Sequence, residues 1–242
     1  MERILRLSAA NIKKHRKQTV LFAVLIMFCM AITASAAAGY YDIKGIFPHI
    51  MKEYSRHQSI MLINDDFYAD YFIDVLREDE RVTDAEHTTM LYSSMTKYID
   101  KTGEERGLYM GFVTMDKHLQ LESSPIETSL SDAEIAAIEH PLYMPYSGRE
   151  SLRSEFKEGD RFDMIYSSKC FSFTVAGFYE SIFLPETNNG FQFIVSDKDY
   201  FTLMTVIDNC DVLLFDCSPT NLCDDVEITF NNKISDRTGH RL

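Results

Sequence analysis

The sequence contains no tryptophan and no motif typical of a catalytic or nucleotide-binding site. It has neither the H-E-x-x-H pattern nor an H-x-H pair, so its seven scattered histidines give metal catalysis no support. G-x-S-x-G, G-x-x-x-x-G-K-[ST] and G-x-G-x-x-G are also absent, and no spacing of Ser, His and Asp favours a triad. We therefore expect no catalytic, cofactor-binding or metal-binding residues, and we expect that the protein is not an enzyme.

Positive charge is scarce beyond the N-terminus. The chain of 242 residues has a formal net charge of −13. Residues 1–18 hold six basic residues and one acidic residue, a net charge of about +5, so the remainder carries about −18. Nucleic-acid binding needs clustered lysine and arginine, so we expect no nucleic acid as a partner. A basic head, an uncharged run and an acidic body predict that the chain crosses a membrane with its N-terminus in the cytoplasm.

The uncharged run of residues 18–41 can be interpreted in two ways. Its most apolar part, residues 20–32, has the length of a signal-peptide core, and A-x-A cleavage sites follow at residues 34–38. Small residues are, however, tolerated within membrane spans, and the whole run is long enough to cross the hydrocarbon core. We favour a retained transmembrane helix over residues 19–41, and cleavage of this segment stays open as the alternative.

Helical periodicity continues on both sides of this run. Residues 1–18 combine an apolar face containing Leu5 and Ile12 with surrounding basic residues, which predicts an amphipathic helix on the inner membrane surface. After the run, apolar residues recur at intervals of three and four, which predicts that the span continues as a helix through Tyr54.

The acidic body alternates strands and helices, a pattern typical of an α+β fold. Gly103 is expected to supply the positive-φ position of a hairpin turn, and Ser131 with Glu134 forms a capping box that opens a helix. Ser196 is expected to cap a short helix after residues 191–195. Helices are also predicted at residues 65–79, 129–141 and 218–234, and strands at residues 57–64, 81–100, 106–116, 140–147, 162–166, 171–177, 191–195 and 209–217.

The segment SEFKEGDRFDMIYSSKCFSFTVAGFYES, residues 154–181, resembles the small β-rich subdomain in the extracytoplasmic region of FtsX/MacB-type ABC-transporter permeases. The likeness rests on the turn at residues 158–160, the alternating strand at residues 162–166 and the strand ending in F-x-V-x-G at residues 173–177. Gly159 suits a tight turn and Gly177 suits a bulge. The stretches NIKKHRK and FIVSDKDYFTLM resemble the start of the family and the part after its β-rich subdomain.

The resemblance implies an α+β fold in which one N-terminal transmembrane helix precedes an extracytoplasmic MacB-like region. That region would consist of a porter-like α+β subdomain and a small β-rich subdomain. The implied division is a cytoplasmic amphipathic basic helix at residues 1–18, a transmembrane helix at 19–41, the porter-like part at 42–145, the β-rich subdomain at 146–182, and return strands and a helix completing the porter-like part at 183–242.

The resemblance also implies a function. The chain would be the N-terminal part of a permease subunit of an ABC transporter, in which a cytoplasmic partner ATPase drives movement of the extracytoplasmic domain. Its partners would be that ATPase, membrane lipid and a second permease in a homo- or heterodimer, all at the plasma membrane. The family has further spans after this region and this sequence shows none, so a truncated chain, a fragmentary gene and a single-span relative all stay open. The alternative is a secreted or anchored ligand-binding or sensor module without an ATPase.

Five cysteines complete the set of reactive residues. Cys29 lies in the membrane run, whereas Cys170, Cys210, Cys217 and Cys223 would lie outside the cell, where disulfides persist. Four cysteines allow three pairings, and the sequence does not choose among them. Cys210 and Cys217 fall at opposite ends of one predicted strand, so Cys217 with Cys223 is the better local candidate. Acidic clusters lack the EF-hand spacing and are expected to be helix caps and solvated faces.

Overall fold

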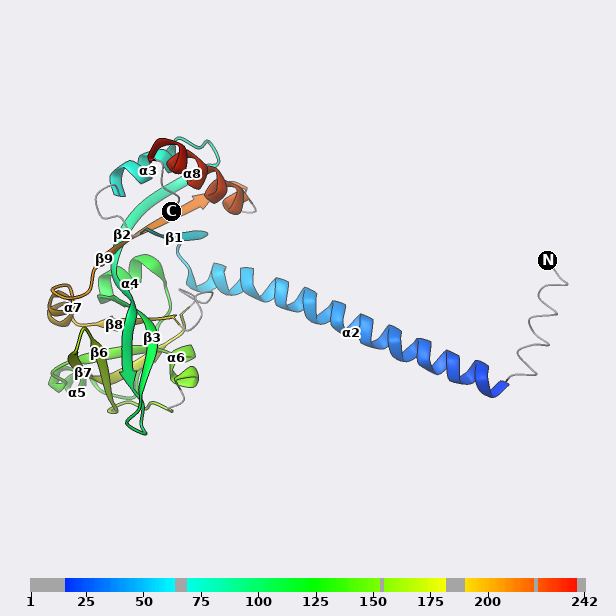
Figure 1. Cartoon of the computed structure of the whole chain (residues 1–242), viewed down its shortest axis with the longest axis horizontal. Coiled ribbons are helices and arrows are strands. Elements are labelled where there is room, and N and C mark those ends of the chain that lie inside the picture. The colour runs from blue at the N-terminus through cyan, green and yellow to red at the C-terminus, as the bar shows by residue number, and fades with distance from the viewer. Residues whose placement is uncertain (1–15, 64–68, 153–154, 182–189, 220–221, 239–242) are drawn as a thin grey trace. The chain divides into compact units, whose positions relative to one another are not determined.

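The computed structural model describes residues 16–63, 69–152, 155–181, 190–219 and 222–238. The chain divides into two compact units, Met1–His49 and Ile50–Leu242. The helices are α2 Arg16–Tyr54, α3 Ala69–Arg77, α4 Met115–Leu121, α5 Asp132–Ala137, α6 Tyr146–Ser151, α7 Asp197–Leu203 and α8 Cys223–Thr238. The strands are β1 Ser59–Ile63, β2 Val82–Ile99, β3 Glu105–Val113, β4 Ile126–Glu127, β5 Pro141–Pro145, β6 Arg161–Tyr166, β7 Lys169–Tyr179, β8 Gly190–Val195 and β9 Asn209–Cys217 (Figure 1).

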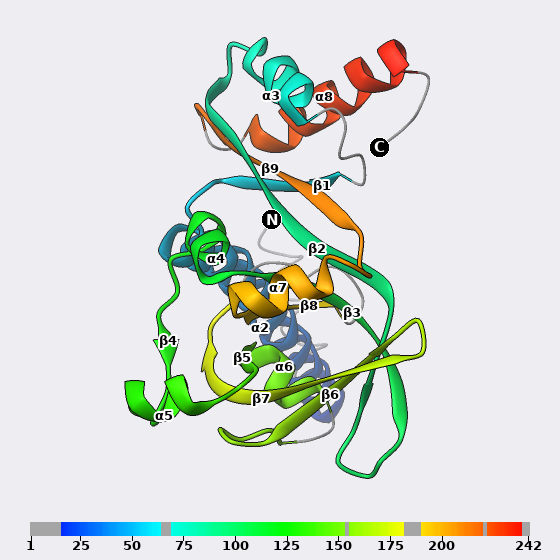
Figure 2. The same ribbon diagram turned by 90° about the vertical axis from the view of Figure 1, so that its left-hand side faces the viewer.

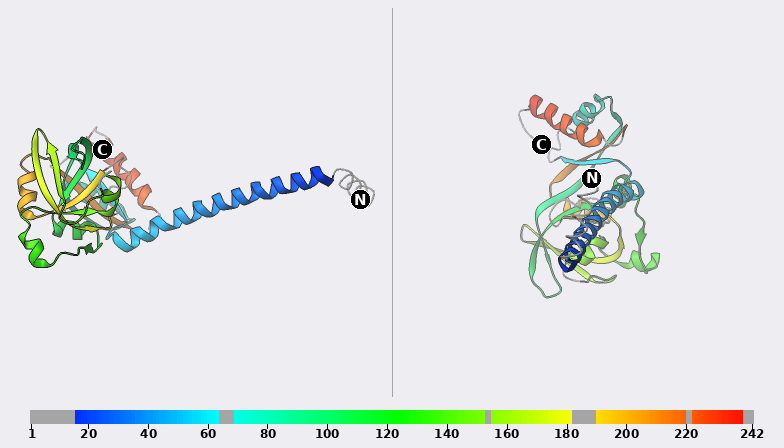
Figure 3. Two further views of the ribbon diagram at one scale, coloured as in Figure 1. Left: turned by 90° about the horizontal axis from the view of Figure 1, so that it is seen from below. Right: turned by 90° about the vertical axis from the view of Figure 1, so that its right-hand side faces the viewer.

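Helix α2 runs without a break from Arg16 to Tyr54, as Figure 3 shows. The prediction that this helix continues through Tyr54 is therefore confirmed. In the part of the chain that the structure describes, no helix combines the length and the hydropathy that a membrane crossing requires. The transmembrane span over residues 19–41 stays a prediction. The predicted amphipathic helix falls on residues 1–18, of which 1–15 lie outside the described residues.

Six strands of the sheet close into a ring. The pairing runs from β2 through β3, β8, β5, β7 and β6, and β6 then pairs back to β2. Closure leaves these strands few free edges, which are otherwise sites of unwanted pairing. The interior is filled by fully buried aromatic rings, with Phe193 5.8 Å from Phe112 and 5.2 Å from Phe162 between ring centroids. Helix α7 adds Tyr200 and Leu203 to this core.

The long strand β2 carries the sheet beyond the ring. Its residues 91–99 pair with β3, whereas residues 82–91 pair with β9, which in turn pairs with β1. Helices α3 and α8 lie side by side over this extension (Figure 2). Phe72 of α3 and Phe230 of α8 meet edge to face at 5.9 Å between centroids. Burial of such rings stabilises this end of the domain.

The turn and cap predictions are confirmed. Gly103 has φ +85° in the β2–β3 hairpin, and Gly159 has φ +84° in the turn before β6. Ser131 and Glu134 form the reciprocal capping box of α5, and Ser196 caps α7. The start of the helix predicted at residues 65–79 lies outside the described residues, which resume at Ala69. These positions were predictable because each depends on a few neighbouring residues.

Two of the predicted strands end earlier than expected, because a short helix begins in each case. The strand predicted over residues 106–116 ends at Val113, because the Thr114 side chain accepts a hydrogen bond from the Lys117 amide and starts α4. The strand predicted over residues 140–147 ends at Pro145, and α6 begins at Tyr146. The domain boundaries predicted after residues 145 and 182 stay predictions.

Candidate functional site

The connector between α2 and β1 is short. Helix α2 ends at Tyr54 and β1 begins at Ser59, which leaves the four residues 55–58 between them. We call residues 55–58, together with the groups that hold them, the joint. All of these groups belong to the unit formed by Ile50–Leu242. The joint therefore determines how the chain leaving α2 is fixed to the sheet.

The backbone of the joint is held by the stretch that follows α4. The Ser123 amide donates to the Tyr54 carbonyl at 2.7 Å, and the Arg56 amide donates to the Leu121 carbonyl at 3.4 Å. Between them, Ser55 and Glu122 form an antiparallel bridge. These contacts resemble one step of a β-ladder, which satisfies backbone groups that a helix end leaves without intrahelical partners.

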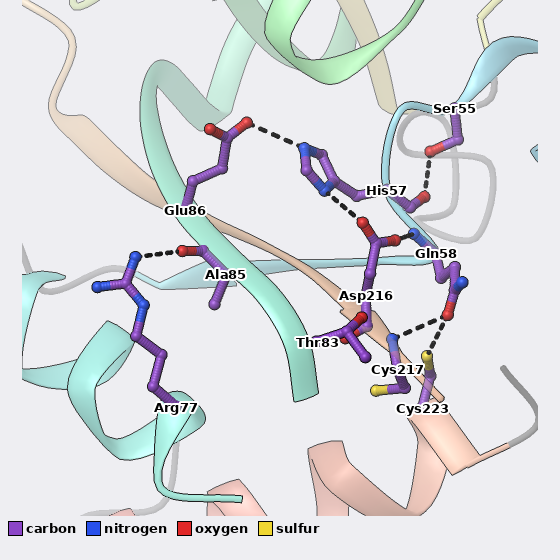
Figure 4. A network of polar contacts seen from close by, with 10 residues as sticks. All are labelled: Ser55, His57, Gln58, Arg77, Thr83, Ala85, Glu86, Asp216, Cys217 and Cys223. Carbon is purple, nitrogen blue, oxygen red and sulfur yellow. Dashed lines mark hydrogen bonds and ion pairs between the residues drawn. The ribbon is translucent and has the colours of Figure 1, made fainter. Parts of the chain in front are cut away.

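His57 fixes the joint to two strands of the sheet (Figure 4). Its Nε2 lies 2.9 Å from Glu86 Oε1 on β2, and its Nδ1 lies 3.2 Å from Asp216 Oδ2 on β9. His57 is 9% exposed. Each ring nitrogen of His57 thus lies at hydrogen-bond distance from a carboxylate oxygen on a different strand. Through these two contacts, His57 joins the connector to β2 and β9.

Gln58 continues the same network. Its amide donates to Asp216 Oδ1 at 2.8 Å, and its side-chain Oε1 accepts from the Cys217 amide at 2.9 Å. The same oxygen lies 3.5 Å from Cys223 Sγ at the start of α8. One residue of the connector thus contacts the end of β9 and the beginning of α8.

The stretch after α4 is itself anchored in a buried polar group. Glu122 is fully buried, and its Oε1 accepts from the Ser181 hydroxyl at 2.9 Å. The His118 ring meets the Tyr179 ring edge to face, and the Tyr179 hydroxyl donates to the Gln192 carbonyl at 2.6 Å. Burial lowers the pKa of His118, because the charged imidazolium would lose its hydration. The Glu122 side chain, next to the Ser123 group that holds Tyr54, is consequently fixed inside the domain.

The cysteines of the chain are free thiols. Cys217 and Cys223, the local pair favoured by the sequence, both border Gln58 in the joint. Burial raises the pKa of Cys217 and raises the pKa of Cys223 to about 12, so both thiols stay protonated at neutral pH. Cys29 and Cys170 are exposed, and Cys210 is buried.

The sequence patterns did not single out His57, Glu86 or Asp216. Glu86 and Asp216 lie 29 and 159 positions from His57 in the sequence. Only the pairing of β2 with β9 brings the two carboxylates to this histidine. No local motif carries such a cluster. Among the described residues, no three His, Cys, Asp or Glu side chains are placed to hold a metal ion. The expectations of no metal and no catalytic residue stay predictions.

No protein-family model matches the sequence, and no curated protein matches it. Solved structures with a similar fold include the extracellular domain of the noncanonic ABC-type transporter YknZ from Gram-positive bacteria, with 8% identity, a TM-score of 0.34, and 75% of this chain and 94% of that chain covered. The periplasmic region of MacB from Actinobacillus actinomycetemcomitans has 9% identity and a TM-score of 0.35, covering 75% and 84% of the two chains.

A third similar structure is a domain of a protein described as a permease from Porphyromonas gingivalis. It has 14% identity and a TM-score of 0.35, and the match covers 66% of this chain and 68% of that chain.

Proposed function

We propose that this chain is the N-terminal part of an ABC-transporter permease subunit, consisting of its first transmembrane helix and an extracytoplasmic domain. In this proposal, a cytoplasmic partner ATPase hydrolyses ATP and the helix passes the resulting movement to the domain. The protein lies in the plasma membrane with its N-terminus in the cytoplasm, and it pairs with a second permease, identical or different. It catalyses no reaction itself.

The observation that carries this proposal is that the connector between Tyr54 and Ser59 is short and that each of its residues is bonded to the rest of the domain. Each of the four connector residues has a backbone or side-chain tie to the sheet unit: Ser55 through its bridge, Arg56 through its amide, and His57 and Gln58 through Asp216. A flexible tether would leave these groups to water. A short, fully bonded connector is what transmission of a small displacement requires, because packed and bonded elements move as units.

Charge and hydropathy support the proposed membrane orientation. The basic residues 1–18 suit the cytoplasmic side, and the acidic body suits the other side. The exposed apolar side chains of α2 suit contact with lipid or with other helices; they include Leu21, Phe28, Met30 and Ile32. The stiff helix then ends in the joint.

The proposal is tested by isolating the full chain from membranes of its native host with an affinity tag at its C-terminus. We expect an ABC ATPase to copurify, and we expect ATP hydrolysis to change the reactivity of labels placed on the extracytoplasmic domain. A variant with two glycines inserted between Arg56 and His57 should retain the ATPase and its hydrolysis but lose the ATP-dependent change. The matched control inserts two glycines after Thr102, in the β2–β3 hairpin tip, and should behave as the parent.

Two results contradict the proposal. If no ATPase copurifies with a correctly inserted chain, the sensor or ligand-binding module without an ATPase becomes the better account. If the glycine insertion in the joint leaves the ATP-dependent change intact, the helix does not pass its movement through residues 55–58.

A further inference from the structure

A hollow of about 440 Å³ opens on the part of the domain formed by β4, α6, β7 and the turn before β6. Four charged side chains line it, two of each sign: Glu127, Arg149, Lys157 and Glu158. The sequence patterns singled out Glu158 only as part of a turn. The hollow shares no residue with the joint, so its charges need an explanation of their own.

The two carboxylates of the hollow accept different numbers of hydrogen bonds from the protein. Glu158 accepts from the Ser129 amide at 2.8 Å through Oε1 and from the Ser129 hydroxyl through Oε2. Burial would raise the pKa of Glu158, but these hydrogen bonds outweigh it and lower the pKa, so the group stays ionised. Glu127 accepts from the Tyr146 hydroxyl at 2.6 Å through Oε2. Among the described residues, none donates a hydrogen bond to its Oε1.

The two cations of the hollow make no salt bridge with any carboxylate in the described part of the chain. The Arg149 guanidinium is nevertheless fixed in place, with its Cζ 4.9 Å from the centre of the Phe178 ring. Tyr146 stacks on the same ring at 5.6 Å, with 21° between the planes. Stacking orients the guanidinium while leaving its N–H donors available. Lys157 adds a second cation at the rim of the same hollow.

Charge balance decides which ligand suits this arrangement. A ligand with a single negative charge would be attracted by Arg149 and Lys157 but repelled by the two carboxylates. A ligand with a single positive charge would be attracted by the carboxylates but repelled by Arg149 and Lys157. A ligand that carries both charges satisfies both sets at once, and its carboxylate can bond the planar guanidinium with two parallel hydrogen bonds. We propose that the hollow binds a small zwitterion, with its carboxylate on Arg149 and Lys157 and its ammonium on Glu127. This inference does not depend on the proposed transport function.

The experiment uses the full chain in lipid nanodiscs and ligand-observed NMR titrations. The probes are ω-amino acids of increasing chain length, namely glycine, β-alanine, 4-aminobutyrate and 6-aminohexanoate, with acetate and methylammonium as single-charge probes. We expect one amino acid of the series to bind about tenfold more tightly than either single-charge probe, because it makes two charge-assisted contacts. The preferred length reports the distance between the two charge sites.

Two variants separate the proposed contacts. Arg149→Gln should abolish binding of the preferred amino acid, whereas Arg161→Gln should leave it unchanged, because exposed Arg161 pairs with Asp163 and lies outside the hollow. Glu127→Gln keeps an acceptor for Tyr146 but removes the charge. It should cancel the preference for the zwitterion over acetate.

Three results overturn the inference. Binding of acetate as tight as that of every amino acid would make the hollow a simple anion site. Absence of binding by all probes would leave it without the proposed ligand class. Equal loss of binding in Arg149→Gln and Arg161→Gln, with circular dichroism unchanged, would place the ligand elsewhere.

Discussion

The joint and the hollow use charged side chains in opposite ways. In the joint, the His57 ring faces a carboxylate at each nitrogen, and Gln58 takes the remaining oxygen of Asp216. In the hollow, neutral donors occupy the carboxylates, and Arg149 stacks on an aromatic ring without a salt bridge in the described residues. Charges that satisfy one another hold chain segments together, whereas charges that are oriented but unpaired are available to a ligand.

The largest effect on stability is expected from breaking the joint. His57→Ala leaves Glu86 and Asp216 without their shared donor, and we expect the free energy of unfolding to fall by about 2–3 kcal/mol. Urea unfolding measures the change. His87→Ala is the matched control, because its side chain is 38% exposed and lies 4.0 Å from the fully exposed Asp70 carboxylate. An equal loss in the two variants would show that His57 is not a fixed point of the domain.

A smaller effect is expected from the backbone beneath the hollow. At Gly177, β7 skips one residue against β5, and an added Cβ would lie 2.8 Å from the Glu127 carbonyl oxygen. Gly177→Ala must therefore shift β4, and we expect a loss of about 1–2 kcal/mol together with weaker zwitterion binding. Gly107→Ala serves as the control, since a Cβ there meets nothing within 4 Å. Full retention of binding in Gly177→Ala would contradict the placement of Glu127 in the site.

The ion pair between Asp79 and Arg81 should also affect how the free energy of unfolding depends on pH under acidic conditions. A hydrogen bond from Arg81 holds the pKa of Asp79 at about 2, below the value of about 4 for an unfolded aspartate. The ion pair therefore stabilises the fold above pH ~4, and its contribution is lost as the pH falls from ~4 to ~2. Asp79→Asn should flatten this part of the curve, whereas Glu80→Gln at an exposed neighbour should not. Parallel curves for Asp79→Asn and the parent would refute the assignment.

The smallest effect on stability is expected from Arg149→Gln. Because Arg149 makes no salt bridge with the described residues, we expect the free energy of unfolding to change by less than about 0.5 kcal/mol. Thermal unfolding and zwitterion binding should be measured on the same sample. Loss of binding without loss of stability would show that Arg149 serves ligand binding, whereas His57 serves the stability of the fold. A loss of stability as large as that of His57→Ala would contradict this difference between the two residues.

Much of the local structure was predictable because it depends on neighbouring residues. The capping box at Ser131, the positive φ of Gly103 and the strand alternation from Phe162 to Tyr166 each follow from short patterns, and the structure has them where expected. The sequence patterns missed helix α4 because Thr114, which caps it, directly follows the apolar pattern of β3. The strand predicted over residues 106–116 therefore ran past the cap. The next residues, Met115 and Asp116, gave only a weak start signal.

Neither the joint nor the hollow could be predicted in this way. His57 finds its partners only after β2 pairs with β9, and Arg149 lines the same hollow as Glu127 only because α6 follows a strand of the closed ring. Closure of the ring depends on the pairing of β6 with both β2 and β7, which hydrophobic periodicity does not specify. Tertiary pairing of this kind brings together residues whose local sequences carry no common signal.

The central claim is that the end of α2 is locked to the sheet through residues 55–58. Native-state hydrogen exchange of the full chain tests it most directly, through the amides of Gln58 and Ser123, which bond Asp216 and Tyr54. We expect both amides to exchange as slowly as the Leu213 amide in the centre of β9, because they would open only with the sheet. Exchange about 100-fold faster at Gln58 and Ser123 than at Leu213 would mean that the connector opens on its own, and would contradict the account.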